Sequence, residues 1–381
     1  MIRVVEVIPT LNMGGAESMV RDYCLLIDKK QFDVCVIVLT EHKGSPIEKN
    51  LEDNGIHVVY LGEQLYESQD INKLKKAIRR VHRYYAFRSI ILSLSPDVIH
   101  IHLQIGKYMR VLPLRKLDVS LFLTVHNVTW RFFSEDVKDG IRYREYKEVY
   151  RLVHSYGLKL IALRDDLNAK LRELFDTDGV ITIKNGIQLD RFNPHLYDRV
   201  IERKRIGIKS DELVLGHVGS MHPQKNHDLI LEIFYAFHEK QPNSILLLIG
   251  KGELMTHIID RISEMHLKDS VIILSNRNDV PQLMSAMDVF LFPSKWEGFG
   301  NALVEAQCMG LPCVVSDVVP EETRITDMVR VVTLDSSINE WTDAVFDAIS
   351  GTIGSKATCK KTDYDIKECV KALENLYKSA I

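Results

Sequence analysis

The sequence predicts an α/β protein made of two doubly wound, Rossmann-like domains. Three observations support this fold. The 381 residues exceed what one ordinary hydrophobic core holds. Strand-length apolar runs alternate with amphipathic helical patterns in both halves of the chain. The alternation pauses near Lys184–Ile187 and restarts at residue 213. We therefore expect a first domain at 1–190, a second at 191–362, and a last helix at 363–381 that crosses back to the first domain.

Composition excludes several classes of protein. A content of 46% hydrophobic and 27% charged residues is typical of a globular chain, and a net charge of −3 argues against general nucleic-acid binding. The longest apolar runs, such as Ser244–Ile249, have the length of a strand, and a strand pattern already occupies residues 1–9, so neither a membrane span nor a signal peptide is expected. The six cysteines form no CxxC pair, and we interpret them as reduced residues of a cytoplasmic protein.

In the first half, a glycine pair follows the first strand. Gly14 and Gly15 let the backbone approach a ligand at the start of a helix, although a tight turn without a ligand explains them equally well. The pattern is not GxGxxG, so it does not indicate a dinucleotide site. The strands expected in this half are residues 3–8, 33–39, 57–61, 98–102, 121–125, 158–163 and 180–183.

A long basic helix is predicted at residues 73–94. From Lys73 to Arg88 it carries seven Lys and Arg residues and no acid, with aromatic residues between them. Such a helix suits an anionic lipid surface, and it suits a solvated face of a core helix equally well.

Histidines end or follow two strands of the first half. His126 comes directly after strand 121–125, where it could donate a hydrogen bond or shuttle a proton; a structural role is the alternative. We interpret His100 and His102 as pointing to opposite faces of their strand, which excludes a shared metal ion. No metal site is predicted.

In the second half, loops after strands carry the chemically useful residues. Lys225 lies ahead of a helix that begins near Asn226, where it could neutralise a phosphate; a surface lysine is the alternative. Glycines at 250 and 252 follow one strand, and the polar loop 275–279 follows another. The strands expected in this half are residues 213–218, 244–249, 271–274, 289–292 and 313–316.

The last of these loops opens a βαβ unit. Glu297 and Glu305 bracket the start of a helix expected at 302–309, with Asn301 as its N-cap. Acids would repel an anion held by the helix N-terminus unless they face neutral hydroxyls, such as those of a sugar or ribose. A charged loop without a ligand is the alternative. Because all these loops follow parallel strands, we expect them to converge on a cleft between the two domains.

These motifs resemble a known family. The segment from Glu297 to Glu305 is similar to the E-x7-E motif of the retaining GT-B glycosyltransferases of group 1 and family 4, a group that includes capsular and exopolysaccharide enzymes. The resemblance extends to Gly14-Gly15-Ala16-Glu17, to Thr124-Val125-His126-Asn127, to Asn185-Gly186-Ile187, to Val218-Gly219 and to Gln224-Lys225-Asn226.

The resemblance implies a role for each matching residue. Glu305 would bind ribose hydroxyls, Glu297 would contact the donor sugar, and Lys225 would stabilise the leaving diphosphate. His126 would lie against the sugar, so His126, Lys225 and Glu297 are the implied catalytic residues. The implied donor-binding residues are Gly14, Gly15, Gly219, Ser220, Lys225, Asn276, Arg277, Gly298, Phe299, Gly300, Asn301, Ala302, Leu303 and Glu305.

Two positions depart from the family pattern. Ser220 stands where the family usually has Arg, which leaves Arg277 or Lys251 to complete the phosphate clamp. Arg164 stands where the family often has Ser, and no role is transferred to it.

The resemblance implies sugar transfer from a UDP- or GDP-sugar to a hydroxyl of a lipid-linked saccharide in surface polysaccharide assembly. The implied reaction retains the anomeric configuration and needs no metal or cofactor. The expected location is the cytoplasm, with peripheral membrane contact through the helix from Lys73 to Arg88. A nucleotide-sugar epimerase and a non-catalytic nucleotide-sugar-binding protein are the alternatives.

Overall fold

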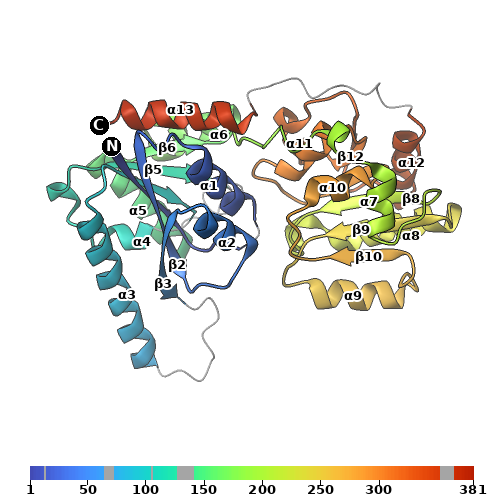
Figure 1. Ribbon diagram of the computed structural model, residues 1–381, viewed down its shortest axis with the longest axis horizontal. Coiled ribbons are helices and arrows are strands. Elements are labelled where there is room, and N and C mark those ends of the chain that lie inside the picture. The colour runs from blue at the N-terminus through green and yellow to red at the C-terminus, as the bar shows by residue number, and fades with distance from the viewer. Residues whose placement is uncertain (13, 64–72, 104–105, 127–140, 352–363) are drawn as a thin grey trace. The chain divides into compact units, whose positions relative to one another are not determined.

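The computed structural model describes the chain except for residues 13, 64–72, 104–105, 127–140 and 352–363, and gives the backbone alone at 63, 73–77 and 141–144. The chain divides into two compact units (Figure 1). Unit 1 contains residues 1–186 and 366–381, and unit 2 contains residues 187–365.

Unit 1 is built on a parallel sheet with the strand order β3-β2-β1-β4-β5-β6-β7. Its strands are β1 (Ile2–Ile8), β2 (Phe32–Thr40), β3 (His57–Glu63), β4 (Val98–His102), β5 (Ser120–Val125), β6 (Lys159–Ala162) and β7 (Val180–Thr182). Its helices are α1 (Gly15–Leu26), α2 (Pro46–Asp53), α3 (Lys73–Leu94), α4 (Gly106–Met109), α5 (Ile141–Tyr156), α6 (Asp165–Phe175) and α13 (Ile366–Lys378).

Unit 2 repeats the same plan with the strand order β10-β9-β8-β11-β12-β13. Its strands are β8 (Leu213–Val218), β9 (Ser244–Ile249), β10 (Val271–Leu274), β11 (Val289–Phe292), β12 (Cys313–Ser316) and β13 (Val329–Val332). Its helices are α7 (Arg199–Arg205), α8 (His227–Lys240), α9 (Met255–Glu264), α10 (Val280–Ser285), α11 (Asn301–Cys308) and α12 (Ile338–Ile349). The prediction of two doubly wound domains is confirmed.

The strands are continuous apolar runs because helices cover both faces of each sheet. In β1, Val5 and Val7 belong to one hydrophobic cluster, whereas Val4 and Ile8 belong to clusters on the other face. Helix α13 covers the face of the sheet to which Val4 points, since its buried Leu373 and Tyr377 pack with Val4. Figure 1 shows this red helix lying along unit 1.

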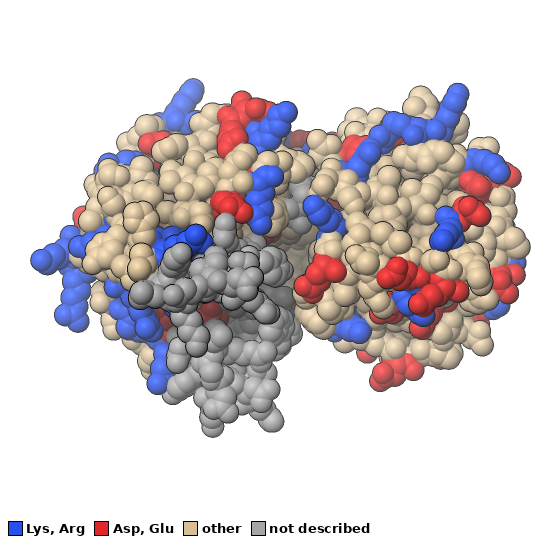
Figure 2. Space-filling view, turned by 90° about the horizontal axis from the view of Figure 1, so that it is seen from below, with Lys and Arg blue, Asp and Glu red and all other residues tan. Residues whose placement is uncertain are grey.

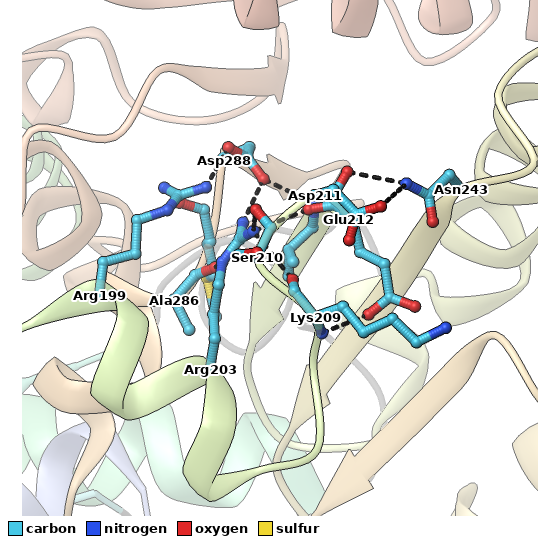
Figure 3. Close-up of polar contacts among 11 residues, drawn as sticks. Arg199, Arg203, Lys209, Ser210, Asp211, Glu212, Asn243, Ala286 and Asp288 are labelled. Carbon is cyan, nitrogen blue, oxygen red and sulfur yellow. Dashed lines mark hydrogen bonds and ion pairs between the residues drawn. The ribbon is translucent and has the colours of Figure 1, made fainter.

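An ion-pair cluster around the buried Arg203 fastens helix α7 to the amino ends of β8 and β11 (Figure 3). The carboxylate of Asp288 accepts hydrogen bonds from Arg203 Nη2 at 2.6 Å and from the Val214 backbone at 2.8 Å, and it also pairs with Arg199. Arg203 Nε donates to the Ala286 carbonyl at 3.0 Å. The cluster therefore holds the two central strands of unit 2 together at the end opposite to their loops.

The cysteine prediction needs one correction. Cys24, Cys35, Cys313 and Cys369 are buried free thiols, as expected. Cys308 instead takes part in a disulfide, so the expectation of six reduced thiols is wrong for it. Among the described helices, none combines the length and the apolar character needed to cross a membrane.

Candidate active site

The candidate site of unit 2 lies where the strand order reverses. Strand β8 pairs with β9 on one side and with β11 on the other, so the connections after β8 and β11 run to opposite faces of the sheet. Doubly wound sheets bind ligands in the crevice at the carboxyl ends of such strands. The loop from Gly219 to Lys225 follows β8, and the loop from Pro293 to Gly300 follows β11.

An ion pair joins these two loops. Lys225, in the short helix η4 (Pro223–Lys225), places Nζ 2.6 Å from Glu297 Oε1. The Gln224 side chain donates to Glu297 Oε2 at 3.1 Å, and Lys225 Nζ lies 4.7 Å from the centre of the Phe292 ring. The side chains of Lys225 and Glu297 are only 13% and 5% exposed. The lysine charge is therefore balanced by an acid before any ligand binds, and an arriving anion would exchange with that acid.

Three glycines allow the neighbouring loops to lie backbone against backbone. A Cβ atom on Gly250 would come within 1.9 Å of the Gly219 carbonyl oxygen, and one on Gly252 within 2.2 Å of the Met221 carbonyl oxygen. The Gly219 N–H donates to Ile249, so Gly219 contributes space at the site and not a free donor. Ser220 is exposed beside it.

Helix α11 begins one residue earlier than predicted, and its cap differs. Gly300, with φ of +96°, is the N-cap, and Asn301 is the first helical residue. The prediction of Asn301 as N-cap is wrong, because glycine alone takes this left-handed conformation without strain. Phe299 and Leu303 are buried in the core of unit 2, so only their backbone can reach a donor. The residues left partly exposed at this helix start are Gly298, Asn301, Ala302 and Glu305.

The polar loop after β10 contains an ion pair between two of its own residues. Asn276 adopts a left-handed conformation with φ of +52°. Arg277 Nε donates to Asp279 Oδ1 at 2.7 Å, and Asp279 also pairs with Arg205 at 2.7 Å. Arg277 therefore has a carboxylate partner within its own loop, and it would have to leave Asp279 to replace the arginine that Ser220 lacks.

In unit 1, the glycine pair starts a helix that an acid covers. Gly14 is the N-cap of α1, and Gly15 is its first residue. The Glu17 carboxylate lies so close that a Cβ atom on Gly14 would be 2.2 Å from Glu17 Oε2. Thr10 donates to the other oxygen of Glu17 at 2.9 Å, and burial raises the pKa of Glu17. A phosphate at this helix start would displace or face that carboxyl group.

His126 belongs to a hydrogen-bonded chain of side chains inside unit 1. Its Nε2 atom lies 3.0 Å from His102 Nδ1, and His102 Nε2 lies 2.6 Å from Glu6 Oε2. His102 and Glu6 are 0% and 2% exposed, whereas His126 is partly exposed at the carboxyl end of β5. Asn127, which follows His126 in the family motif, lies outside the described residues.

The prediction that His100 and His102 point to opposite faces is wrong. Their ring centres are 4.2 Å apart, and both rings approach Glu6, because residues two apart along a strand share a face. His100 also contacts the Tyr377 hydroxyl at 2.6 Å and the Thr124 hydroxyl at 2.7 Å. Glu6, His100 and His102 bring potential ligand atoms within 4.8 Å of one another, but side-chain hydrogen bonds engage them, and we assign no metal to the cluster.

Burial and neighbouring charges set the protonation of this cluster. Burial raises the pKa of Glu6, but the charge of His100 and hydrogen bonds from His100 and His102 outweigh it and hold that pKa well below the ordinary value. Burial, together with His100, lowers the pKa of His102 to about 4. Burial and the same neighbours lower the pKa of His126 well below its ordinary range. Glu6 is therefore ionised and both His102 and His126 are neutral at pH 7.

The sequence motifs do not predict that Glu6 and Tyr377 belong to this cluster. Glu6 carries a usable signal, since an acid in the middle of a buried apolar strand requires a buried partner. Tyr377 carries no such signal, because it lies 371 residues from Glu6 along the chain. Only the fold brings its hydroxyl to within 3.0 Å of Glu6 Oε1. Arg164, to which no role was transferred, is bidentate on Asp166 at 2.8 and 2.9 Å.

The chain has the features of the GT-B class. It contains two doubly wound parallel sheets, and the second carries a lysine, a carboxylate and a helix start at the point where its strand order reverses. Residues 13–191 match the family described as Glycosyltransferase Family 4, and residues 198–362 match Glycosyl transferases group 1. The chain therefore belongs to the group 1, family 4 glycosyltransferases.

Similar proteins span nearly the whole chain. EpsF of Bacillus subtilis (strain 168) is 28% identical over 98% of this chain and 96% of its own length. The UDP-Gal:alpha-D-GlcNAc-diphosphoundecaprenol alpha-1,3-galactosyltransferase of Escherichia coli is 25% identical over 98% of this chain and 95% of its own length. The capsular polysaccharide biosynthesis glycosyltransferase CapM of Staphylococcus aureus is 25% identical over 81% of this chain and 78% of its own length. The fold is shared with Anabaena Alr3699/HepE, solved in complex with UDP and glucose, at a TM-score of 0.77, 17% identity and full coverage of both chains.

Proposed function

We propose that this glycosyltransferase moves a sugar from a UDP- or GDP-sugar to a hydroxyl of a lipid-linked saccharide, with retention of the anomeric configuration and without an essential metal. The observation that carries the proposal is the Lys225–Glu297 pair at the carboxyl ends of β8 and β11. A cation there suits the leaving diphosphate, and the acid suits the hydroxyls of the sugar.

The positive charge needed by the leaving group has sources within unit 2. Lys225 would exchange Glu297 for the β-phosphate, and the start of α11 would add its dipole and backbone N–H groups. Glu305, one turn into α11, would accept hydrogen bonds from ribose hydroxyls. Gly15, at the start of α1 in unit 1, would add backbone N–H groups to the diphosphate. With these groups in place, the chemistry calls for no metal to neutralise the diphosphate.

Retention follows most simply from a front-face displacement. The acceptor hydroxyl attacks from the side that the diphosphate leaves, and the departing phosphate oxygen takes the hydroxyl proton. Lys225 stabilises the charge that develops on that phosphate. His126 lies against the donor sugar as a neutral imidazole, and Glu297 orients the sugar through its hydroxyls.

Relatives supply the support for donor and acceptor. HepE was solved with UDP and glucose, and the E. coli relative takes its acceptor on diphosphoundecaprenol. The test is a panel of UDP- and GDP-sugars with undecaprenyl-diphosphate saccharides, with and without EDTA, and the product anomer read by NMR. Transfer with an α-linked product from an α-donor, unaffected by EDTA, is the expected result.

The same panel separates the alternatives. An isomerised nucleotide sugar formed from donor alone would identify an epimerase. Tight nucleotide binding with no transfer to any acceptor would identify a binding protein. An inverted product, or activity abolished by EDTA and restored by Mg²⁺, would contradict the mechanism proposed here.

We further propose that helix α3 contacts the anionic membrane that carries the acceptor. Its apolar residues Ile78, Val81 and Tyr85 are 60%, 51% and 69% exposed, and Arg79 and Arg80 are exposed beside them. Figure 2 shows Lys and Arg side chains gathered on unit 1 beside the grey atoms, with few acids among them. Apolar and basic side chains together favour an anionic lipid surface.

Liposome flotation tests the membrane proposal. The Arg79→Glu/Arg80→Glu variant is expected to lose flotation with vesicles containing anionic lipid, whereas the matched Arg115→Glu/Lys116→Glu variant, which reverses two exposed charges elsewhere on unit 1, retains it. Equal flotation of both variants would leave α3 as an ordinary solvated helix.

A further inference from the structure

A chain of hydrogen bonds runs from the buried centre of the unit 1 sheet to the partly exposed ring of His126. It starts at Glu6 in β1, passes through His102 at the end of β4, and reaches His126 after β5. The three residues lie on adjacent strands, since β4 pairs with β1 on one side and with β5 on the other. The donor-to-acceptor distances are 2.6 Å at Glu6 and 3.0 Å at His126.

The proton positions along this chain follow from its buried end. An ionised carboxylate only accepts hydrogen bonds, so His102 must carry its proton on Nε2 to bond Glu6. Neutral His102 then has a lone pair on Nδ1. His126 must therefore donate from Nε2, which leaves Nδ1 as the nitrogen of its ring that accepts a hydrogen bond.

We infer that Glu6 and His102 are positioning residues that hold His126 in its Nε2–H tautomer, with Nδ1 presented as an acceptor for a hydroxyl of the donor sugar. The inference rests on the proposed function, in which His126 contacts that sugar. It assigns the imidazole a hydrogen-bond-accepting role and excludes proton donation to the substrate from Nδ1. A carboxylate behind a histidine sets its tautomer in the same way in hydrolase triads.

The surroundings of Glu6 keep its acceptor role in place. Tyr377 donates to Glu6 Oε1 at 3.0 Å, and His100 Nδ1 lies 3.3 Å from Glu6 Oε2. Thr124 bonds the far nitrogen of His100. Both carboxylate oxygens are thus engaged, and the side chain cannot turn away from His102 without breaking these contacts.

Glu6→Gln is the informative substitution. A glutamine amide has nearly the same shape, but it can donate as well as accept, so His102 and then His126 are free to reverse their tautomers. Tyr377→Phe is the matched control, because it removes a buried hydrogen bond from the same carboxylate and leaves the Glu6–His102–His126 chain whole.

The readout is the tautomer of His126, measured by long-range ¹H–¹⁵N NMR on protein with ¹⁵N-labelled histidine. The His126 signals are identified as those absent from His126→Gln. We expect the Nε2–H tautomer in the wild type and in Tyr377→Phe, and an Nδ1–H or mixed state in Glu6→Gln. We also expect kcat/KM for the donor to fall by roughly 10–100-fold in Glu6→Gln and by less than about threefold in Tyr377→Phe.

Wild-type His126 in the Nδ1–H or charged form would overturn the inference, and this result does not require Glu6→Gln to fold. Equal kcat/KM for Glu6→Gln and Tyr377→Phe would also overturn it. A wild type that shows the Nε2–H tautomer but transfers no sugar to any acceptor would refute the proposed function instead, so the two failures are distinguishable.

Discussion

Replacement of Lys225 tests the centre of the proposed site. Lys225→Met keeps the length of the side chain over Phe292 and removes the charge that faces Glu297 at 2.6 Å. Two losses are expected. Glu297 stays buried with the Gln224 side chain still donating to it, and breaking a buried pair in this way costs about 3–5 kcal/mol of folding stability. If Lys225 also clamps the leaving diphosphate, kcat falls by roughly 10²–10³, or about 3–4 kcal/mol of transition-state stabilisation.

A second ion pair, in which the arginine is buried, separates these two losses. Arg203→Met breaks the contact with Asp288 at 2.6 Å in the same unit, and it acts at the amino ends of β8 and β11, opposite to the site. Asp288 keeps Arg199 and the Val214 N–H as partners, but the 3% exposed Arg203 also donates to the carbonyls of Ala286, Ser210 and Glu212. Because these acceptors lose their donor as well, a loss of stability of comparable size is expected. Its kcat should match that of the wild type once the folded fraction is corrected for.

The assay pairs thermal unfolding of both variants with kcat measured well below their melting temperatures. We expect similar melting temperatures and a kcat that is low in Lys225→Met alone. If the kcat of Lys225→Met is within about threefold of that of Arg203→Met, Lys225 has a structural role and the phosphate clamp is refuted.

Three further predictions concern the surroundings of the Lys225–Glu297 pair. Gly250→Ala should unfold unit 2 or displace Gly219, because the added Cβ would lie 1.9 Å from the Gly219 carbonyl oxygen. The control Gly207→Ala has open space around its Cβ and φ of +81°, so the free energy of unfolding measured in urea should fall by only about 1–2 kcal/mol. Ser220→Arg should tighten binding of UDP or GDP by about threefold to fivefold in calorimetry, and the gain should vanish at high salt. Burial, with Lys225, lowers the pKa of His227 to about 4. Because the unfolded pKa is about 6.5, stability is full above that pH and falls by on the order of 3 kcal/mol as pH drops to 4; His227→Phe should flatten this slope, and an unchanged slope would contradict the assignment.

Local patterns accounted for most elements and for the position of the unit 2 loops. The helix predicted at residues 73–94 is α3 with the same bounds, and the strands before Gly219, Gly250 and Glu297 are β8, β9 and β11. These predictions succeeded because apolar runs of strand length in a parallel sheet are buried on both faces and stand out from the polar loops. Strand β13 was missed, since its four residues include a charged arginine.

Some local predictions failed for reasons that concern backbone geometry. Asn301 is a good N-cap residue by type, but the chain reaches α11 through a left-handed Gly300, which takes the capping position. The faces of His100 and His102 follow directly from the two-residue period of a strand, which places both side chains on the same face of the sheet.

The sequence by itself determined the two doubly wound units, the family, and the loops that carry Lys225, Glu297 and Glu305, because these depend on patterns within short stretches. The tertiary structure alone decided which polar groups meet. Lys225 and Glu297 are 72 residues apart, and Tyr377 and Glu6 are 371 apart. Pairs of this kind depend on strand order and on the return of α13 to unit 1, and burial then selects the partners, since a charge removed from water needs a hydrogen-bonding group beside it. For the same reason the role of His126 was open in the sequence, and its tautomer is set by a carboxylate two strands away.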